Sequence, residues 1–71
     1  MTYGEQAVGL SFNPSGDKDV EHIKKLYAQI IDFCNEARNG KSEKARLYSV
    51  AITEAQTAQM WAVKAITWKD S

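Results

Sequence analysis

The sequence contains few of the residues that cross-link small folds. Its 71 residues include one cysteine, Cys34, one histidine, His22, and one proline, Pro14. A single cysteine excludes an internal disulfide, and one cysteine with one histidine cannot supply the Cys/His ligands of a structural zinc site. A core of this size rarely contributes more than about 3–5 kcal/mol, so we expect further stability from contacts between subunits.

The sequence also lacks an excess of charge and a long apolar run. Nine basic and nine acidic residues give a formal net charge of +0. Binding to duplex nucleic acid without regard to sequence needs many phosphate contacts from lysine and arginine, so we do not expect it. No stretch approaches the roughly 18–20 apolar residues of a membrane span, and the first residues lack the pattern of a signal peptide. These features predict a protein of the reducing cytosol that does not associate with membranes.

No group of residues indicates catalysis. His22 has no serine or cysteine nucleophile at a recognisable spacing, and Asp32 and Glu36 form an acidic pair that is typical of a solvated helix face. The sequence has no glycine-rich phosphate loop and no dinucleotide-binding fingerprint. We therefore predict that the protein is not an enzyme and that it uses no cofactor and no metal ion.

The sequence does contain two blocks of helical periodicity. Apolar residues recur at steps of three and four after Asp17, a predicted N-cap, and the Asn39–Gly40 pair ends this pattern, which predicts a helix over residues 17–39. Ser42 is the next predicted N-cap, and we expect a long helix over residues 42–69. The short linker between them predicts an antiparallel helical hairpin, and hence a single all-α domain.

The N-terminal segment, residues 1–16, differs from the rest in composition. It holds three of the four glycines and the only proline, and turn-forming residues follow Phe12. Alternation of Val8, Leu10 and Phe12 is compatible with an extended segment, whereas residues 3–8 could instead form one helical turn. The sequence leaves both alternatives open.

The second predicted helix carries a stripe of small residues. Ala51, Ala55, Ala58, Ala62 and Ala65 follow at steps of four and three, which are heptad positions. Either large residues of the first helix fill the space beside these alanines, or the stripe packs against its copy in another subunit. In both cases more apolar surface remains than one partner helix can cover, so we expect a homo-oligomer.

Two groups of residues could bind a flat, charged ligand. Lys64 follows Trp61 by three residues and precedes Trp68 by four, so its ammonium can reach both rings, and Thr67 lies beside it. Tryptophans at this spacing are also typical of subunit contacts. The second group combines an aromatic ring, turn residues and two lysines: Phe12, Asn13, Pro14, Ser15, Lys24 and Lys25. The alternative interpretation is that this segment is only a turn and that the lysines are solvated.

Two long stretches of the sequence resemble a known family. "GLSFNPSGDKDVEHIKKLYAQIIDF" and "AITEAQTAQMWAVKAITW" are similar to small phage proteins of the anti-CBASS sponge family, and the most specific pieces are "FNPS" and "AQMWAVKAITW". The resemblance implies a helical hairpin that assembles into hexamers in the cytoplasm of an infected bacterium. It also implies that the protein sequesters cyclic oligonucleotides made by the CBASS immune cyclase and does not cleave them.

The resemblance also implies two kinds of binding site. Cyclic dinucleotides such as 3′,3′-cGAMP would bind between two protomers, held by Phe12 and by Lys24 or Lys25. Cyclic trinucleotides would bind where three protomers meet, held by Lys64 and Thr67. Phe12 lacks the hydroxyl of the tyrosine that is frequent in the family, and a lysine in place of an arginine loses a bidentate phosphate contact. The alternative hypothesis is a helical adaptor that oligomerises and binds a host or phage protein.

Overall fold

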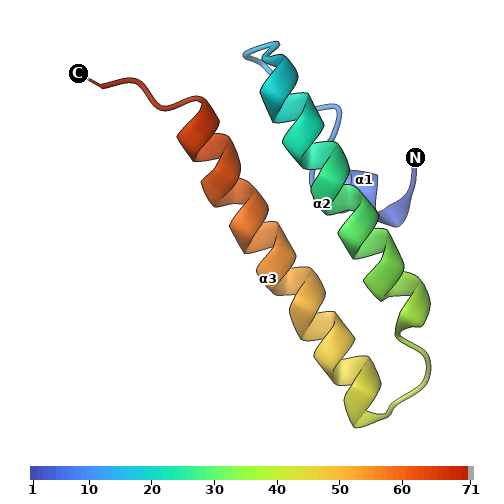
Figure 1. The fold of residues 1–71 in the computed structure, drawn as a ribbon. Helices are drawn as coiled ribbons and strands as arrows, with labels where there is room; N and C mark the ends of the chain where they lie inside the picture. The colour runs from blue at the N-terminus through green and yellow to red at the C-terminus, as the bar shows by residue number, and fades with distance from the viewer. Residues whose placement is uncertain (71) are drawn as a thin grey trace.

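Two long helices lie antiparallel and side by side, and a short third helix precedes them (Figure 1). The computed structural model describes residues 1–70. Its helices are α1 (Tyr3–Ala7), α2 (Lys18–Ala37) and α3 (Glu43–Ile66), and residues 1–70 contain no strand. The predicted all-α hairpin is therefore confirmed. None of these helices is both long and apolar enough to cross a membrane.

The helix ends follow local capping signals. The Asp17 carboxylate accepts hydrogen bonds from the backbone N–H groups of Asp19 and Val20, and the Ser42 hydroxyl accepts one from Ala45. Gly40 has φ +73°, the left-handed conformation expected after the first long helix. The last helix ends three residues before the predicted position 69, because the chain leaves helical geometry at Thr67, where neither glycine nor proline marks the end.

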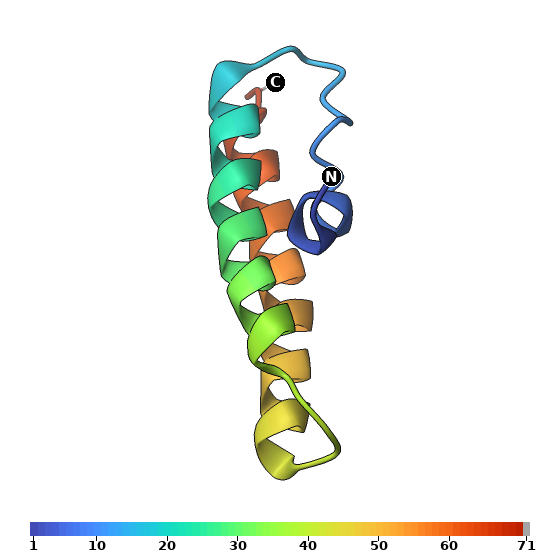
Figure 2. The same ribbon diagram turned by 90° about the vertical axis from the view of Figure 1, so that its right-hand side faces the viewer.

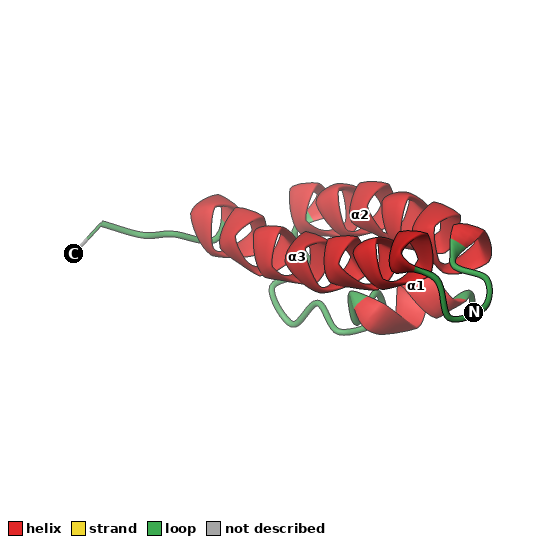
Figure 3. Cartoon of the chain, turned by 90° about the horizontal axis from the view of Figure 1, so that it is seen from below, coloured by secondary structure: helices red, strands yellow, loops and turns green. Residues whose placement is uncertain are grey.

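The N-terminal segment begins with a helix, which decides between the two alternatives left open by the sequence. Thr2 and Glu5 form a capping box: the Thr2 hydroxyl accepts from the Glu5 N–H, and the Glu5 carboxylate accepts from the Thr2 N–H. Figures 2 and 3 show α1 against one face of the layer that α2 and α3 form. The Gly4 N–H donates to Asp32 Oδ1 over 2.6 Å, and this bond fixes α1 on α2.

The core lies between the three helices and is small. Its buried members are Val8, Ala28, Ile31, Cys34 and Ile52, and Ile31 is 0% exposed. The apolar stripe that was expected on the first long helix is only partly correct. Ile30 remains 51% exposed. The buried face of α2 in this region is formed by Lys24, Ala28 and Ile31.

The alanine stripe of α3 is divided between two environments. Ala55 is half-buried and packs against the core, and Ala62 is also half-buried. Ala51, Ala58 and Ala65 are exposed. Packing within the protomer therefore accounts for only one edge of the stripe, which contacts the core. The other edge is exposed and remains available for a contact with another subunit.

Candidate functional site

A groove at the open end of the hairpin combines most of the residues predicted to bind a ligand. This end lies opposite the 38–42 linker, where α2 begins and α3 ends (Figure 1). The groove has a volume of about 320 Å³. Six of the eight predicted residues line it, together with Val20 and Val63; they are Phe12, Asn13, Pro14, Ser15, Lys24 and Thr67.

Lys24 lies at the base of this groove and is only 5% exposed. Its ammonium donates hydrogen bonds to the backbone carbonyls of Gly9, over 2.9 Å, and of Phe12. No carboxylate forms an ion pair with it within residues 1–70. An ammonium has three donors, so one remains for a ligand after both carbonyls are satisfied. The groove is therefore electropositive at its base.

Phe12 places a large aromatic ring beside this ammonium. The ring is 72% exposed, and Lys24 Nζ lies 5.8 Å from its centroid. An aromatic side chain that contributes so little to the core of a small protein is available for contact with a ligand or a subunit. The geometry offers a flat apolar surface next to a positive charge, and this combination suits a nucleotide base and its phosphate.

The loop that carries Phe12 is fixed by its own hydrogen bonds. Asn13 Nδ2 donates to the Asp17 carbonyl over 3.0 Å, and Asn13 Oδ1 accepts from the Ser15 hydroxyl over 2.8 Å. The Gly16 N–H donates to the Asn13 carbonyl over 3.1 Å. The Gly16 N–H is therefore not free to bind an anion. The two alternatives, a turn and a binding site, are therefore compatible, because the turn residues form one wall of the groove.

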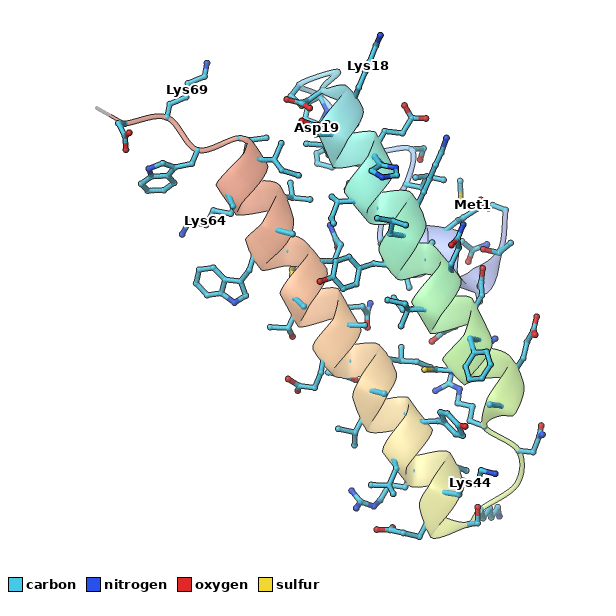
Figure 4. The ribbon with its side chains drawn as sticks, in the orientation of Figure 1. Met1, Lys18, Asp19, Lys44, Lys64 and Lys69 are labelled. Carbon is cyan, nitrogen blue, oxygen red and sulfur yellow. The ribbon has the colours of Figure 1, made fainter. Side chains whose placement is uncertain are left out.

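Lys25 and Lys64 lie away from this groove. Lys25 is exposed and forms an ion pair with Glu21, with 3.0 Å between Lys25 Nζ and Glu21 Oε1. Lys64 Nζ lies 5.2 Å from the ring centroid of Trp61 and 5.7 Å from that of Trp68, which confirms that it reaches both rings. Figure 4 shows Lys64 on the side of α3 that faces away from α2.

Lys64 and Thr67 therefore belong to different surfaces of one protomer. Lys64 lines a shallow groove of about 290 Å³ with Thr57, Met60 and Trp61. The Thr67 hydroxyl donates to the Val63 carbonyl over 2.8 Å and lies beside Phe12 and Lys24 in the open-end groove. Lys64 and Thr67, the two residues predicted to bind a cyclic trinucleotide, could therefore meet in one site only if they came from different subunits.

Two wall residues of the open-end groove were not predicted. Val20 and Val63 supply its apolar sides, and Val63 lies four residues before Thr67 on the same face of α3. That spacing was a usable signal in the sequence, because residues four apart on a helix share a face. Within residues 1–70, no cluster of histidine, cysteine and carboxylate side chains could hold a metal ion.

The comparison with known families matches most of the chain. The sequence model of the Acb2/Tad1 hairpin domain matches residues 4–67, which include α1 from its second residue, all of α2 and α3, and the open-end groove. The chain belongs to the Acb2/Tad1 hairpin family. The resemblance to anti-CBASS sponges that the sequence predicted is thereby confirmed. No curated protein and no solved structure gives a significant match.

Proposed function

We propose that this member of the Acb2/Tad1 hairpin family binds and sequesters cyclic dinucleotides, such as 3′,3′-cGAMP, and thereby blocks activation of CBASS effectors in a phage-infected bacterium. The observation that carries this proposal is the pairing of the exposed Phe12 ring with the buried Lys24 ammonium in one groove. The cytoplasm of the infected cell is where such a protein meets the product of the cyclase.

Each part of a cyclic dinucleotide has a matching part in the groove. A base can stack on the ring of Phe12, a contact worth about 1–3 kcal/mol in comparable sites. A phosphate can accept the remaining N–H of Lys24, which burial keeps in a fixed position. No histidine, cysteine or carboxylate side chain lines the groove. We therefore propose that the nucleotide is held and released intact.

Assembly of several protomers is part of this proposal. The described residues span 47 × 25 × 13 Å, so the hairpin is a thin layer with α1 on one face. Leu26, Ile30 and Phe33 are 41%, 51% and 67% exposed on α2, and Trp61 is 65% exposed on α3. Soluble monomers avoid apolar patches of this extent, so further subunits would cover them.

The exposed edge of α3 has the spacing of a subunit contact. Seven exposed residues of α3 follow one another at alternating steps of three and four, as in a heptad seam: Lys44, Leu47, Ala51, Glu54, Ala58, Trp61 and Ala65. If two copies of this edge pair antiparallel about a two-fold axis, large residues meet small ones. Leu47 then lies opposite Ala65 and Trp61 opposite Ala51, so the same surface complements itself.

A hexamer needs a second contact surface, and α2 supplies a candidate. Leu26, Ile30 and Phe33 form a stripe on the side of α2 away from Ala28 and Asp32, which adjoin α1. Two-fold contacts through α3 and further contacts through this stripe could close six copies into one assembly. A cyclic dinucleotide has two similar halves, which suits a pocket completed by a second copy of the open-end groove.

Cyclic trinucleotides are the second ligand class that we propose. Lys64 between Trp61 and Trp68 offers stacking surfaces and a charge outside the open-end groove. Thr67 of another protomer could complete this site in the hexamer.

Isothermal titration calorimetry of the purified protein with 3′,3′-cGAMP tests the proposal, and recovery of intact nucleotide after heating the complex tests the absence of cleavage. Sedimentation gives the mass of the same sample. A hexamer that binds the nucleotide supports the proposal. The exposed α3 edge also favours the helical adaptor as a second candidate function, and a folded dimer without affinity at micromolar nucleotide would support that adaptor and refute sequestration.

A further inference from the structure

A second groove adjoins the open-end groove and shares Phe12 with it. It runs between α1, the loop after α1 and α3, and its volume is about 500 Å³. Phe12, Lys24 and Val63 line both grooves, so a ligand stacked on Phe12 and bound to Lys24 can extend into either. The residues that belong only to the second groove include Gln59 and Met60 of α3.

Gln59 is the unusual member of this second groove. It is 5% exposed, and its side-chain amide forms no hydrogen bond with another group in residues 1–70. Gln56, one turn earlier on α3, instead donates from Nε2 to the Ala7 carbonyl over 3.2 Å. In the described part of the chain, every fully buried side-chain nitrogen or oxygen has a hydrogen-bond partner. The Gln59 amide has none, so its atoms are not fully buried, and its small exposed area lies at the groove that it lines.

The Gln59 amide pairs with no other group in the described residues, so its groove-facing atoms are left for water or for a ligand. The Gln59 amide offers one acceptor and two donors in a plane. The edge of a nucleobase offers a matching pair of donor and acceptor atoms, and glutamine binds adenine in this bidentate way in other nucleic-acid complexes. The apolar side chains of Phe12 and Met60 beside it suit the faces of such a base.

We infer that Gln59 binds the edge of one base of the cyclic dinucleotide, and that this contact selects among bases. The inference rests on the proposed function, because it assigns a specificity residue to the same ligand. Phe12 and Lys24 would bind any nucleotide through its ring and its phosphate. Among the buried side chains of the second groove, Gln59 offers both a donor and an acceptor to a base edge, whereas Lys24 offers donors only.

The experiment compares Gln59→Met with wild type by calorimetry, using 3′,3′-cGAMP and a cyclic dinucleotide whose bases are unsubstituted purine. Methionine keeps the length and burial of the side chain but removes both hydrogen-bonding groups. We expect the substitution to lower the affinity for 3′,3′-cGAMP about tenfold and to leave the affinity for the purine analogue unchanged. Gln29→Met, on the exposed face of α2, is the matched control and should change neither affinity.

The outcomes separate this inference from the proposed function. If wild type binds 3′,3′-cGAMP and Gln59→Met binds it equally well, the inference is refuted and sequestration stands. If wild type binds no cyclic nucleotide, both are refuted. If Gln59→Met does not fold, the wild-type protein alone decides: an analogue bound about tenfold more weakly than 3′,3′-cGAMP supports the base-edge contact, and one bound equally well refutes it.

Discussion

Replacing Gly4 by alanine tests whether close backbone packing holds α1 on the hairpin. An added Cβ would overlap the carbonyl oxygen of Ala28 and lie 2.9 Å from its carbonyl carbon. It would also lie 2.8 Å from Asp32 Oδ1, the acceptor of the Gly4 N–H. Backbone atoms cannot rotate out of the way, so α1 must move away from α2.

The expected size of the effect follows from the contacts that α1 makes. Alanine is favoured over glycine inside a helix by about 0.5–1 kcal/mol, which would stabilise the variant if Gly4 faced open space. Overpacking against fixed atoms costs about 1–3 kcal/mol. Weakening the hydrogen bond to the Asp32 carboxylate costs about 1.5–3 kcal/mol. We therefore expect a net destabilisation of about 2–4 kcal/mol, most of what a core of this size supplies.

Chemical unfolding followed by circular dichroism measures this change. Gly40→Ala is the control, because Gly40 is exposed, has no heavy atom within 4 Å of an added Cβ and has φ +73°. It should lose only about 1–2 kcal/mol from the left-handed backbone. A Gly4→Ala variant as stable as wild type, or more stable, would refute the docking of α1 described above.

Two further predictions concern charged side chains. Lys24→Met should lower the affinity for 3′,3′-cGAMP at least about tenfold in calorimetry, because the ammonium holds the Phe12 loop and would face the phosphate. Lys25→Met, which removes an exposed lysine paired with Glu21, should have little effect. Equal losses of affinity in the two variants would contradict the proposed site. A hydrogen bond from Arg46 lowers the pKa of the Glu43 carboxyl below its ordinary value of 4.5, so the stability that this pair contributes is present above pH 4.5 and is lost as the pH falls through the lowered pKa. The thermal midpoint of Arg46→Ala should consequently fall less between pH 7 and pH 3 than that of wild type, and identical falls would contradict the assignment.

The parts of the fold that depend on neighbouring residues could be predicted from the sequence. The hairpin follows from the N-caps at Asp17 and Ser42 and from the stop at Gly40, and each of these acts within one helical turn. The helix α1 also had a local signal, since the Thr2–Glu5 pair has the spacing of a capping box. This spacing was not used, so the choice between a helical turn over residues 3–8 and an extended segment stayed open.

The parts that depend on distant contacts could not be predicted. Lys24 shares a helix face with apolar residues, yet its burial requires the carbonyls of Gly9 and Phe12, which only the path of the N-terminal loop brings near. The same holds for Gln59, whose surroundings come from α1 and the loop. Residue types did indicate the site around "SFNPSGD", but not which lysine joins it. Geometry separates Lys24 from Lys25, because adjacent helical residues point in different directions.

The buried lysine connects the small fold to the proposed function. Lys24 is held by two backbone carbonyls of the chain itself, and these contacts fix the loop of Phe12 beside the ammonium. A preformed site loses little conformational entropy when it binds, and this favours high affinity without any change of shape. A protein that only sequesters its ligand needs no more than this. The proposed binding would in turn stabilise the folded state by mass action, by about 2.7 kcal/mol at a ligand concentration of 100 times Kd. A short chain with one small core would therefore gain from its ligand a stability comparable to what its own core supplies.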